Sequence, residues 1–277
     1  MYLTDSSTAR HHGSLSDDTR GGATPRAAAT RAHRVPDVPA PLRRPPVDLE
    51  VIIPAYNEAR RLPLTLGATA DYLARQPWSS AVVVVDNDSV DSTAEALEHL
   101  GEAPVETYLI GCSERGKGAA VRRGIATSSA RFVGFVDADN ATPIEALDQV
   151  VPLLRQGYGA VIASRRCAGA RYQVEQSVLR RGGGWLFRAC AHLAVPGIAD
   201  TQCGFKFFDG PLVRDLVRDC RINGFAFDVE LLSRVVREGR QAVEVPVAWS
   251  DVPGSTFSPR RDGMRSMADL LRISLSR

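Results

Sequence analysis

Arg131-Phe-Val-Gly-Phe-Val-Asp-Ala-Asp139 is the most informative segment of this sequence. Residues 132–136 are apolar and favour β-structure, so they predict a strand that is buried on both faces of a sheet. Asp137 and Asp139 follow at the strand end, the edge at which open α/β sheets bind ligands. Two carboxylates so close repel each other unless a divalent cation neutralises them. The stretch therefore predicts a magnesium or manganese site for a diphosphate, against the alternative of a solvated turn.

Composition limits the class of protein. The chain has 277 residues, 44% of them apolar, which is enough for one large domain or two small ones. A formal net charge of +2 gives no overall electrostatic reason to expect nucleic-acid binding. Five cysteines without a Cys-x-x-Cys pair argue against a disulfide framework or a zinc site. We find neither an apolar signal core nor the roughly 20 apolar residues of a membrane span. We therefore expect a cytoplasmic protein, at most peripheral at the inner face of the membrane.

Lysine is rare in this chain. Of the 34 basic residues 32 are arginine, and only Lys117 and Lys206 are lysine. A lysine is a slim point charge that can follow a phosphate into a tight space where a planar guanidinium does not fit. Both lysines have glycine neighbours, in Arg115-Gly-Lys-Gly118 and Gln202-Cys-Gly-Phe-Lys206. We therefore predict that both belong to the site, against the alternative of two surface lysines that are present by chance.

The fold is predicted to be α/β, a single doubly wound and mostly parallel sheet flanked by helices, after a disordered basic arm over residues 1–46. The domain is expected to span residues 47–277. Residues 177–195 mix arginine with large apolar side chains, which predicts either an interfacial stretch or an ordinary helix that covers the sheet. Strands are predicted over 49–53, 81–85, 105–110, 132–136, 160–163 and 242–249. Helices are predicted over 59–76, from Asp91 or Ser92 to Leu100, and over 117–128, from near Pro143, over 227–238 and over 264–276.

Four loops follow successive predicted strands, and a doubly wound sheet gathers such loops on one rim. Tyr56 offers a ring for stacking, while Glu58 and Asn87 can pair with base or ribose. Gly116–Gly118 brings backbone N–H groups and Lys117 to a helix N-terminus, which favours an anion. The rim thus has the parts for a nucleoside diphosphate and a metal. The loops are residues 54–58, 86–89, 111–118 and 137–139.

The chain resembles family 2 glycosyltransferases of the GT-A fold, in particular the polyprenyl- or dolichyl-phosphate glucosyltransferases. The resemblance covers roughly residues 48–275, and the order of its motifs is what makes it specific. The motifs are Val51-Ile-Ile-Pro-Ala-Tyr-Asn-Glu58, Asp86-Asn-Asp-Ser89, Arg115-Gly-Lys-Gly118, Asp137-Ala-Asp139, Ser164-Arg165, Asp200-Thr-Gln-Cys-Gly-Phe-Lys206, Gly224-Phe-Ala-Phe-Asp-Val-Glu-Leu-Leu232 and Val245-Pro-Val-Ala-Trp249.

The resemblance implies an inverting, metal-dependent transfer of a hexose, with glucose favoured, from a UDP-linked sugar to polyprenyl phosphate. Residues 47–139 would form the nucleotide-sugar half and residues 140–277 the acceptor half. Asp139 and Asp137 would bind magnesium or manganese. The nucleotide sugar would contact Pro54, Tyr56, Glu58, Asn87, Lys117 and Asp137. The leaving diphosphate or an acceptor phosphate would face Arg165, Lys206, Arg260 and Arg261.

Asp228 has three interpretations at this stage. It is a general base if the acceptor is a neutral hydroxyl, because an inverting transfer then needs a base opposite the leaving group. It is a positioning residue if the acceptor is a phosphate, in which case Asp228→Asn is expected to keep most activity and Lys206→Ala to lose it. It also stands where a carboxylate would cap the following helix.

Two departures from the family pattern bear on substrate. Asn87 stands where many members carry a second Asp, so the position has lost a charge and gained a donor. Lipid-directed relatives often bear transmembrane helices, so the alternative acceptor is soluble, such as a specialised metabolite or a carrier-bound intermediate. Outside the class, the rivals are a sugar-phosphate nucleotidyltransferase, which opens on a glycine-rich loop, and a binding module without catalysis.

Overall fold

The computed structural model describes residues 44–95, 103–172, 187–250 and 261–275. Nearly all of the predicted arm, the predicted helix end at Leu100, the arginine- and tryptophan-bearing residues 180–186 and Arg260 lie outside these ranges. Residues 187–194 are helical, and Ala191 and Val195 are buried in the core. The described end of the 177–195 stretch is therefore an ordinary covering helix.

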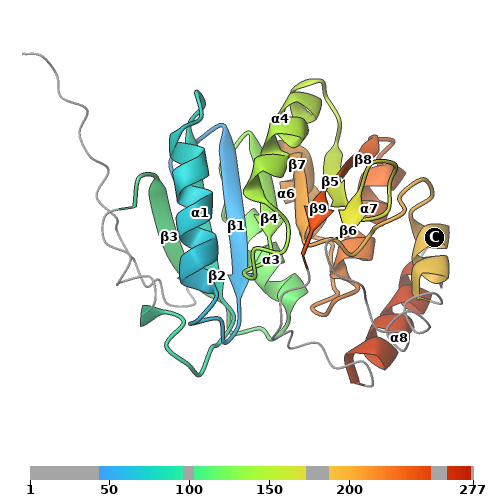
Figure 1. Ribbon diagram of the computed structural model, residues 1–277. Coiled ribbons are helices and arrows are strands. Elements are labelled where there is room, and N and C mark those ends of the chain that lie inside the picture. The colour runs from blue at the N-terminus through green and yellow to red at the C-terminus, as the bar shows by residue number, and fades with distance from the viewer. Residues whose placement is uncertain (1–43, 96–102, 173–186, 251–260, 276–277) are drawn as a thin grey trace, which may run out of the picture.

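A seven-stranded sheet with the order β3-β2-β1-β4-β7-β5-β8 forms the centre of the molecule (Figure 1). Its pairings are parallel except those of β7, which runs antiparallel between β4 and β5. The predicted mostly parallel α/β sheet is thus confirmed, although no strand was predicted at β7. The strands are β1 (Leu49–Ala55), β2 (Ser80–Asp86), β3 (Glu106–Gly111), β4 (Phe132–Val136), β5 (Ala160–Ser164), β7 (Phe205–Asp209) and β8 (Ala242–Pro246).

Helices cover both faces of the sheet (Figure 1). One face carries α1 (Leu62–Ala74), the short 3-10 helix η1 (Ile144–Ala146) and α4 (Leu147–Arg155). The other carries α3 (Lys117–Ala126), α6 (Gly210–Val217) and α7 (Phe227–Arg237), and α8 (Arg261–Leu275) packs beside α7. The predicted strand over 242–249 divides into β8 and β9 (Ala248–Trp249), and β9 pairs with β6 (Arg171–Tyr172) in a second small sheet.

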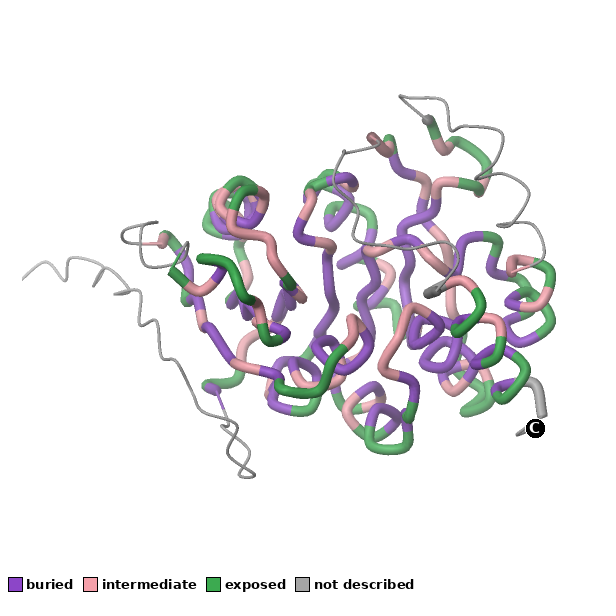
Figure 2. The backbone as a smooth tube through the Cα atoms, turned by 90° about the horizontal axis from the view of Figure 1, so that it is seen from below, coloured by how far each residue is buried: buried purple, intermediate pink, exposed green. Residues whose placement is uncertain are grey.

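The alternation of side chains along β1 explains the two apolar cores. Ile52 packs with the α3 side, whereas Val51 and Ile53 pack with the α1 side. Figure 2 shows the result as buried residues along most strands and exposed residues on the outer sides of the helices. Because both faces are covered, the polar chemistry of this fold is left to the rim where the strands end.

That rim gathers the loops predicted from the sequence. The parallel strands β1, β2, β3 and β4 end there, and β7 begins there because Phe205 lies opposite Val136. The backbone ties the loops together: Asn87 N donates to Ala55 O at 2.8 Å, and Asp137 N donates to Gly204 O at 2.9 Å. The start of β7 thus becomes part of the rim, a placement that the strand order alone produces.

Candidate active site

A cleft of about 1170 Å³ opens at this rim. It is lined by the loops after β1 to β4, the start of α3, residues 221–225, α7 and α8. Ligand sites are typically about 300–1,000 Å³, so the cleft has room for a nucleotide sugar and part of a second substrate. Its lining includes the whole set predicted for the nucleotide sugar and the metal, namely Pro54, Tyr56, Glu58, Asn87, Lys117, Asp137 and Asp139.

Asp137 and Lys117 both line the cleft and form an ion pair, with Asp137 Oδ1 2.6 Å from Lys117 Nζ. Burial works against the charged form of Lys117, but the nearby charges of Asp137, Asp228 and Asp139 outweigh it and raise its pKa. Gly204 is what lets the Asp137 carboxylate lie where it does. A Cβ at Gly204 would stand 1.8 Å from Asp137 Oδ2, so only glycine fits there.

Asp139 is half-buried in the turn after β4. Burial raises its pKa, and the neighbouring charge of Asp137 raises it further. The turn is held on both sides: Ala141 N donates to Asp139 Oδ1 at 3.1 Å, and Thr65 of α1 donates through Oγ1 to Ala138 O at 2.7 Å. A carboxylate that is fixed in place and costly to ionise gains most from a bound cation.

The donor set of this turn fits a hard divalent cation. Within the described ranges no cluster of three or more His, Cys, Asp or Glu side chains is placed to enclose a metal. The turn itself offers the two carboxylates of Asp137 and Asp139. Mg²⁺ commonly takes one or two carboxylates and fills its other positions with substrate phosphates and water. The residues present therefore suit a metal that binds together with a diphosphate.

The side chain of Asn87 holds the loop before α3 in place through three hydrogen bonds. Its Nδ2 donates to Cys112 O at 3.2 Å and to Glu114 O at 2.6 Å, while its Oδ1 accepts from Gly116 N at 2.8 Å. An Asp could not donate to either carbonyl, which explains why an amide stands at this position. These hydrogen bonds leave one lone pair on Oδ1, which a base could use. The contact of Asn87 with a base stays a prediction.

The loop after β1 presents one aromatic ring and one ion pair to the cleft. Tyr56 is 45% exposed, so its ring is open to stacking. Arg61 donates to Glu58 through two bonds, from Nε at 2.7 Å and from a terminal nitrogen at 2.6 Å. Burial raises the pKa of Glu58, and the hydrogen bonds from Arg61 oppose that rise. Arg61 lines the cleft but was not predicted, although its three-residue spacing from Glu58 was a usable signal.

Lys206 and Asp228 are placed differently from our prediction. Lys206 lies on β7 with none of its surface exposed, and it does not line the cleft. Its Nζ donates to Cys203 O and lies 2.9 Å from Asp228 Oδ1, in an ion pair not aligned as a hydrogen bond. The predicted contact of Lys206 with a phosphate does not fit this burial. The two residues instead join β7 to the start of α7.

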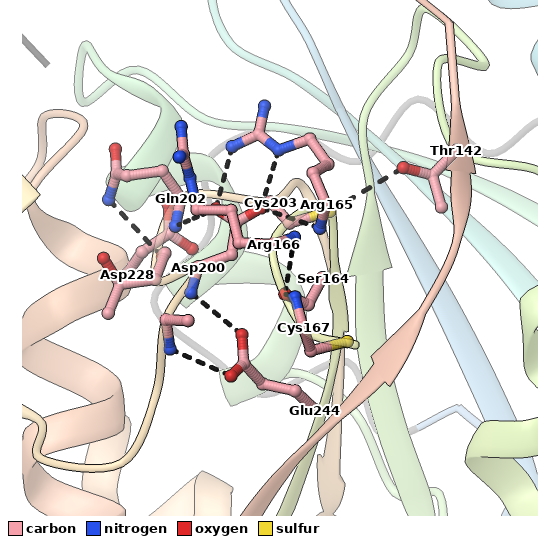
Figure 3. A network of polar contacts seen from close by, with 12 residues as sticks. Thr142, Ser164, Arg165, Arg166, Cys167, Asp200, Gln202, Cys203, Asp228 and Glu244 are labelled. Carbon is pink, nitrogen blue, oxygen red and sulfur yellow. Dashed lines mark hydrogen bonds and ion pairs between the residues drawn. The ribbon is translucent and has the colours of Figure 1, made fainter. Parts of the chain in front are cut away.

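Arg165 belongs to the polar network that Figure 3 shows. It donates from Nε to Asp200 Oδ2 at 2.7 Å and from a terminal nitrogen to Oδ1 at 2.8 Å, and its guanidinium lies 5.3 Å from the Trp249 ring centroid. Glu244 holds Asp200 in turn by accepting from its backbone N at 2.8 Å. A second cavity, about 70 Å³, brings Arg165 together with Asp137 and Asp139.

The remaining predicted residues are not placed at the site. Arg260 lies outside the described residues, and Arg261 begins α8 without a described side chain. Their predicted contact with a phosphate stays a prediction. Among the helices that the structure describes, each is too short or too polar to cross a lipid bilayer.

Residues 50–209 match the family model "Glycosyl transferase family 2". This chain belongs to glycosyl transferase family 2. Among curated proteins, the dolichyl-phosphate beta-glucosyltransferase of Dictyostelium discoideum is 32% identical over 245 residues, which cover 82% of this chain and 75% of the relative. The enzyme of the same name from Drosophila melanogaster is 33% identical over 252 residues, covering 83% and 75%. The predicted family and the assignment as a glycosyltransferase are thereby confirmed.

Solved structures share the fold of this glycosyltransferase. Glucosyl-3-phosphoglycerate synthase of Mycobacterium tuberculosis superposes with a TM-score of 0.62 at 17% identity, covering 82% of this chain and 80% of that one. The same enzyme in complex with Mn²⁺, UDP-glucose and glycerol 3-phosphate also gives 0.62, at 17% identity and the same coverage. At this level of identity the likeness concerns the fold alone.

Proposed function

We propose that this glycosyltransferase moves glucose from UDP-glucose to a polyprenyl phosphate, with inversion at the anomeric carbon. The observation that carries the proposal is the single cleft at which the loops after β1 to β4 bring together Tyr56, Glu58, Lys117 and the Asp137–Asp139 turn. The choice of glucose and lipid phosphate is supported by relatives that are about one-third identical and are named dolichyl-phosphate beta-glucosyltransferases.

The donor would lie along the wall formed by the loops. The open ring of Tyr56 would stack on the base, and Glu58, held by Arg61, would accept from ribose hydroxyls. Lys117 would contribute its charge to the diphosphate. Asp139 and Asp137 would hold Mg²⁺ or Mn²⁺, which when bound neutralises charge on the departing diphosphate.

The acceptor phosphate needs no base to attack. Its oxygen is already anionic near neutral pH, so it can bond to the anomeric carbon directly while the bond to the UDP oxygen breaks and UDP leaves with the electron pair. Attack from the face opposite UDP inverts the centre. Asp228 then has no proton to remove, which agrees with its place as the buried partner of Lys206.

The cell compartment forms part of the proposal. A polyprenyl-phosphate acceptor would require the enzyme to work at a membrane surface, and a reducing compartment suits its five free cysteines. We place the enzyme in the cytoplasm, peripheral at the inner face of the membrane.

The test is direct transfer. The full chain is incubated with labelled UDP-glucose, a polyprenyl phosphate and Mn²⁺ or Mg²⁺, and the organic phase is analysed for a glucolipid and its anomeric configuration. We expect a β-linked product that is lost on chelation. GDP-mannose and TDP-glucose serve as donor controls, and 3-phosphoglycerate and glycerol 3-phosphate as soluble acceptors. Glucose appearing only on a soluble phosphate would move the acceptor to the alternative class, and no turnover with any donor would overturn the proposal.

A further inference from the structure

The turn that carries Asp137 and Asp139 borders two cavities. Among the described residues, these two aspartates alone line both the large cleft and the second, smaller cavity. The nucleotide loops line only the cleft, whereas Arg165 lines only the second cavity. A group on that side meets the part of a substrate that lies at the carboxylate turn, away from the nucleoside. The orientation of Arg165 therefore bears on the reacting bond more than on nucleotide binding.

Asp200 holds the guanidinium of Arg165 in one orientation. Asp200 is buried, and its two carboxylate oxygens accept from Nε and from a terminal nitrogen of Arg165. Its Oδ2 also accepts from the backbone N of Arg165 at 3.0 Å. A bidentate pair of this kind fixes the plane of the guanidinium as well as its distance. The position of Asp200 thus decides the direction in which Arg165 points.

Glu244 of β8 holds the backbone on which Asp200 lies. Its Oε2 accepts from Ala199 N at 2.9 Å, and its Oε1 accepts from Asp200 N at 2.8 Å. β8 is the parallel neighbour of β5, with Glu244 opposite Ile162, and Arg165 directly follows β5. In Figure 3 the dashed lines run from Glu244 to Asp200 and from Asp200 to the Arg165 guanidinium. These contacts connect β8 to the second cavity.

We propose that Glu244 is a positioning residue for sugar transfer, which acts through Asp200 to orient the Arg165 guanidinium at the carboxylate turn. Glu244 lines neither cavity, so it does not contact the substrate itself. The proposal rests on the proposed function and deepens it, because it adds a residue that sets the rate of turnover from outside the substrate site. Loss of Glu244 is expected to lower kcat and to spare nucleotide binding.

Steady-state kinetics of the full chain with UDP-glucose, a polyprenyl phosphate and Mn²⁺ tests this role. Glu244→Ala removes both acceptors, so kcat is expected to fall about 10- to 100-fold. The KM for UDP-glucose is expected to stay within about twofold, because the nucleotide loops lie on the other cavity. Glu244→Gln keeps one acceptor oxygen, and its kcat is expected to lie between those of the wild type and Glu244→Ala.

The matched control is Asp48→Ala. Asp48 also accepts two hydrogen bonds from a distant segment, from Ser79 N at 3.0 Å and Ser79 Oγ at 2.8 Å, but it precedes β1 at the end of the sheet away from the rim. Asp48→Ala and Glu244→Ala are both expected to lower the thermal midpoint, and only Glu244→Ala to lower kcat. A kcat that Glu244→Ala leaves unchanged overturns the proposal.

A double-mutant cycle tests the route through Arg165. If Glu244 acts by orienting Arg165, adding Glu244→Ala to Arg165→Gln is expected to lower kcat no further than Arg165→Gln alone does. Two losses that multiply in the double variant would show that Glu244 acts by another route, and the proposal would be wrong.

Trp249 provides a readout without turnover. The guanidinium of Arg165 lies 5.3 Å from the centroid of the Trp249 ring, so its movement changes the electrostatic surroundings of the indole. With the other two tryptophans replaced by phenylalanine, Glu244→Ala and Arg165→Gln are expected to shift the fluorescence emission maximum in the same direction. An unchanged emission in Glu244→Ala overturns the proposal. If the emission shifts but the wild type transfers glucose to no acceptor, the positioning of Arg165 by Glu244 stands and the proposed function fails.

Discussion

Two lysine–aspartate pairs lie over the same aromatic ring, yet they face different surroundings. The Nζ atoms of Lys117 and Lys206 stand 5.5 and 5.4 Å from the centre of the Phe135 ring. In the first pair the side chains of Lys117 and Asp137 are 20% and 39% exposed. In the second, Lys206 and Asp228 are 0% and 5% exposed. The two lysines of the chain thus contact the same ring, but one borders the cleft and the other is buried.

The difference in exposure indicates different roles for the two ion pairs, ligand binding for the exposed pair and stabilisation of the fold for the buried pair. An ion pair that borders a cleft can exchange its partner for a ligand, because water and substrate reach it. A buried pair cannot, and removing one partner leaves an uncompensated charge in a medium of low dielectric. We therefore propose that Lys117 and Asp137 bind substrate, whereas Lys206 and Asp228 join β7 to the start of α7.

The largest expected effect comes from breaking the buried pair. Asp228→Asn leaves Lys206 charged and enclosed, so we expect the free energy of unfolding to fall by about 3–5 kcal/mol. Urea denaturation measures it, with Glu238→Gln, an exposed change at the end of the same helix, as control. A loss of stability of this size would also lower activity in the assay, in contrast to the expectation from sequence that Asp228→Asn keeps most activity with a phosphate acceptor.

Rescue distinguishes positioning from catalysis at the same pair. Lys206→Met combined with Asp228→Leu removes both charges and fills the space with apolar groups, so most of the lost stability is expected to return. Glucosyl transfer is expected to return with it. A double variant that regains stability but stays inactive would show that Asp228 takes part in the reaction.

Substitutions at the cleft, in Lys117 and in the neighbouring Asp139, are expected to reduce activity far more than stability. Asp139→Asn and Lys117→Gln should each lower kcat/KM by about 100-fold or more, since each removes charge stabilisation from the departing diphosphate. Stability of the ligand-free protein should rise for Asp139→Asn, because ionised Asp139 is disfavoured by burial. Lys117→Gln should lower stability, but by less than a change in the buried pair does, because Lys117 and Asp137 are partly exposed to solvent. Transfer assays with parallel thermal melts check both, and a large loss of stability would remove the contrast with the buried pair.

Asn87→Asp tests the loop that carries Lys117. The change turns two donated hydrogen bonds into contacts between a carboxylate and carbonyl oxygens, so we expect a loss of about 1–3 kcal/mol. Hydrogen exchange over residues 111–118 should rise. Asp88→Asn, the reverse change at a neighbouring position whose side chain is exposed, gives the control.

The smallest expected effect is on the pH dependence of stability, through a third ion pair, Arg165–Asp200, which is less exposed than the pair at the cleft. Burial opposes ionisation of Asp200, but the hydrogen bonds and charge of Arg165 outweigh it, and the pKa of Asp200 is held below its ordinary value of 3.8. Its stabilisation is therefore present above about pH 4 and is lost as pH falls through the lowered pKa. Denaturation between pH 5 and 2.5 should show a shallower loss of stability in Asp200→Asn than in the wild type.

Much of the fold is readable from local pattern. Residues 132–136 form β4 as predicted, and the predicted strands at 49–53 and 81–85 match β1 and β2 except at their ends. Apolar runs of that length encode burial on both faces, and the turn residues after them place polar groups on one rim. For the same reason the sequence alone predicts that the four loops after the strands lie at one site.

Local sequence pattern was enough to predict most strands of the sheet, the family and the loops of the rim, because each of these is a property of neighbouring residues. The burial of Lys206 depends on long-range pairing instead, since β7 has a lysine at the second of its five positions and lies between β4 and β5 through pairings distant along the chain. The same pairings bring Asp228 against it. A charge near a glycine indicates a site, but burial decides whether that charge meets a ligand or its own protein.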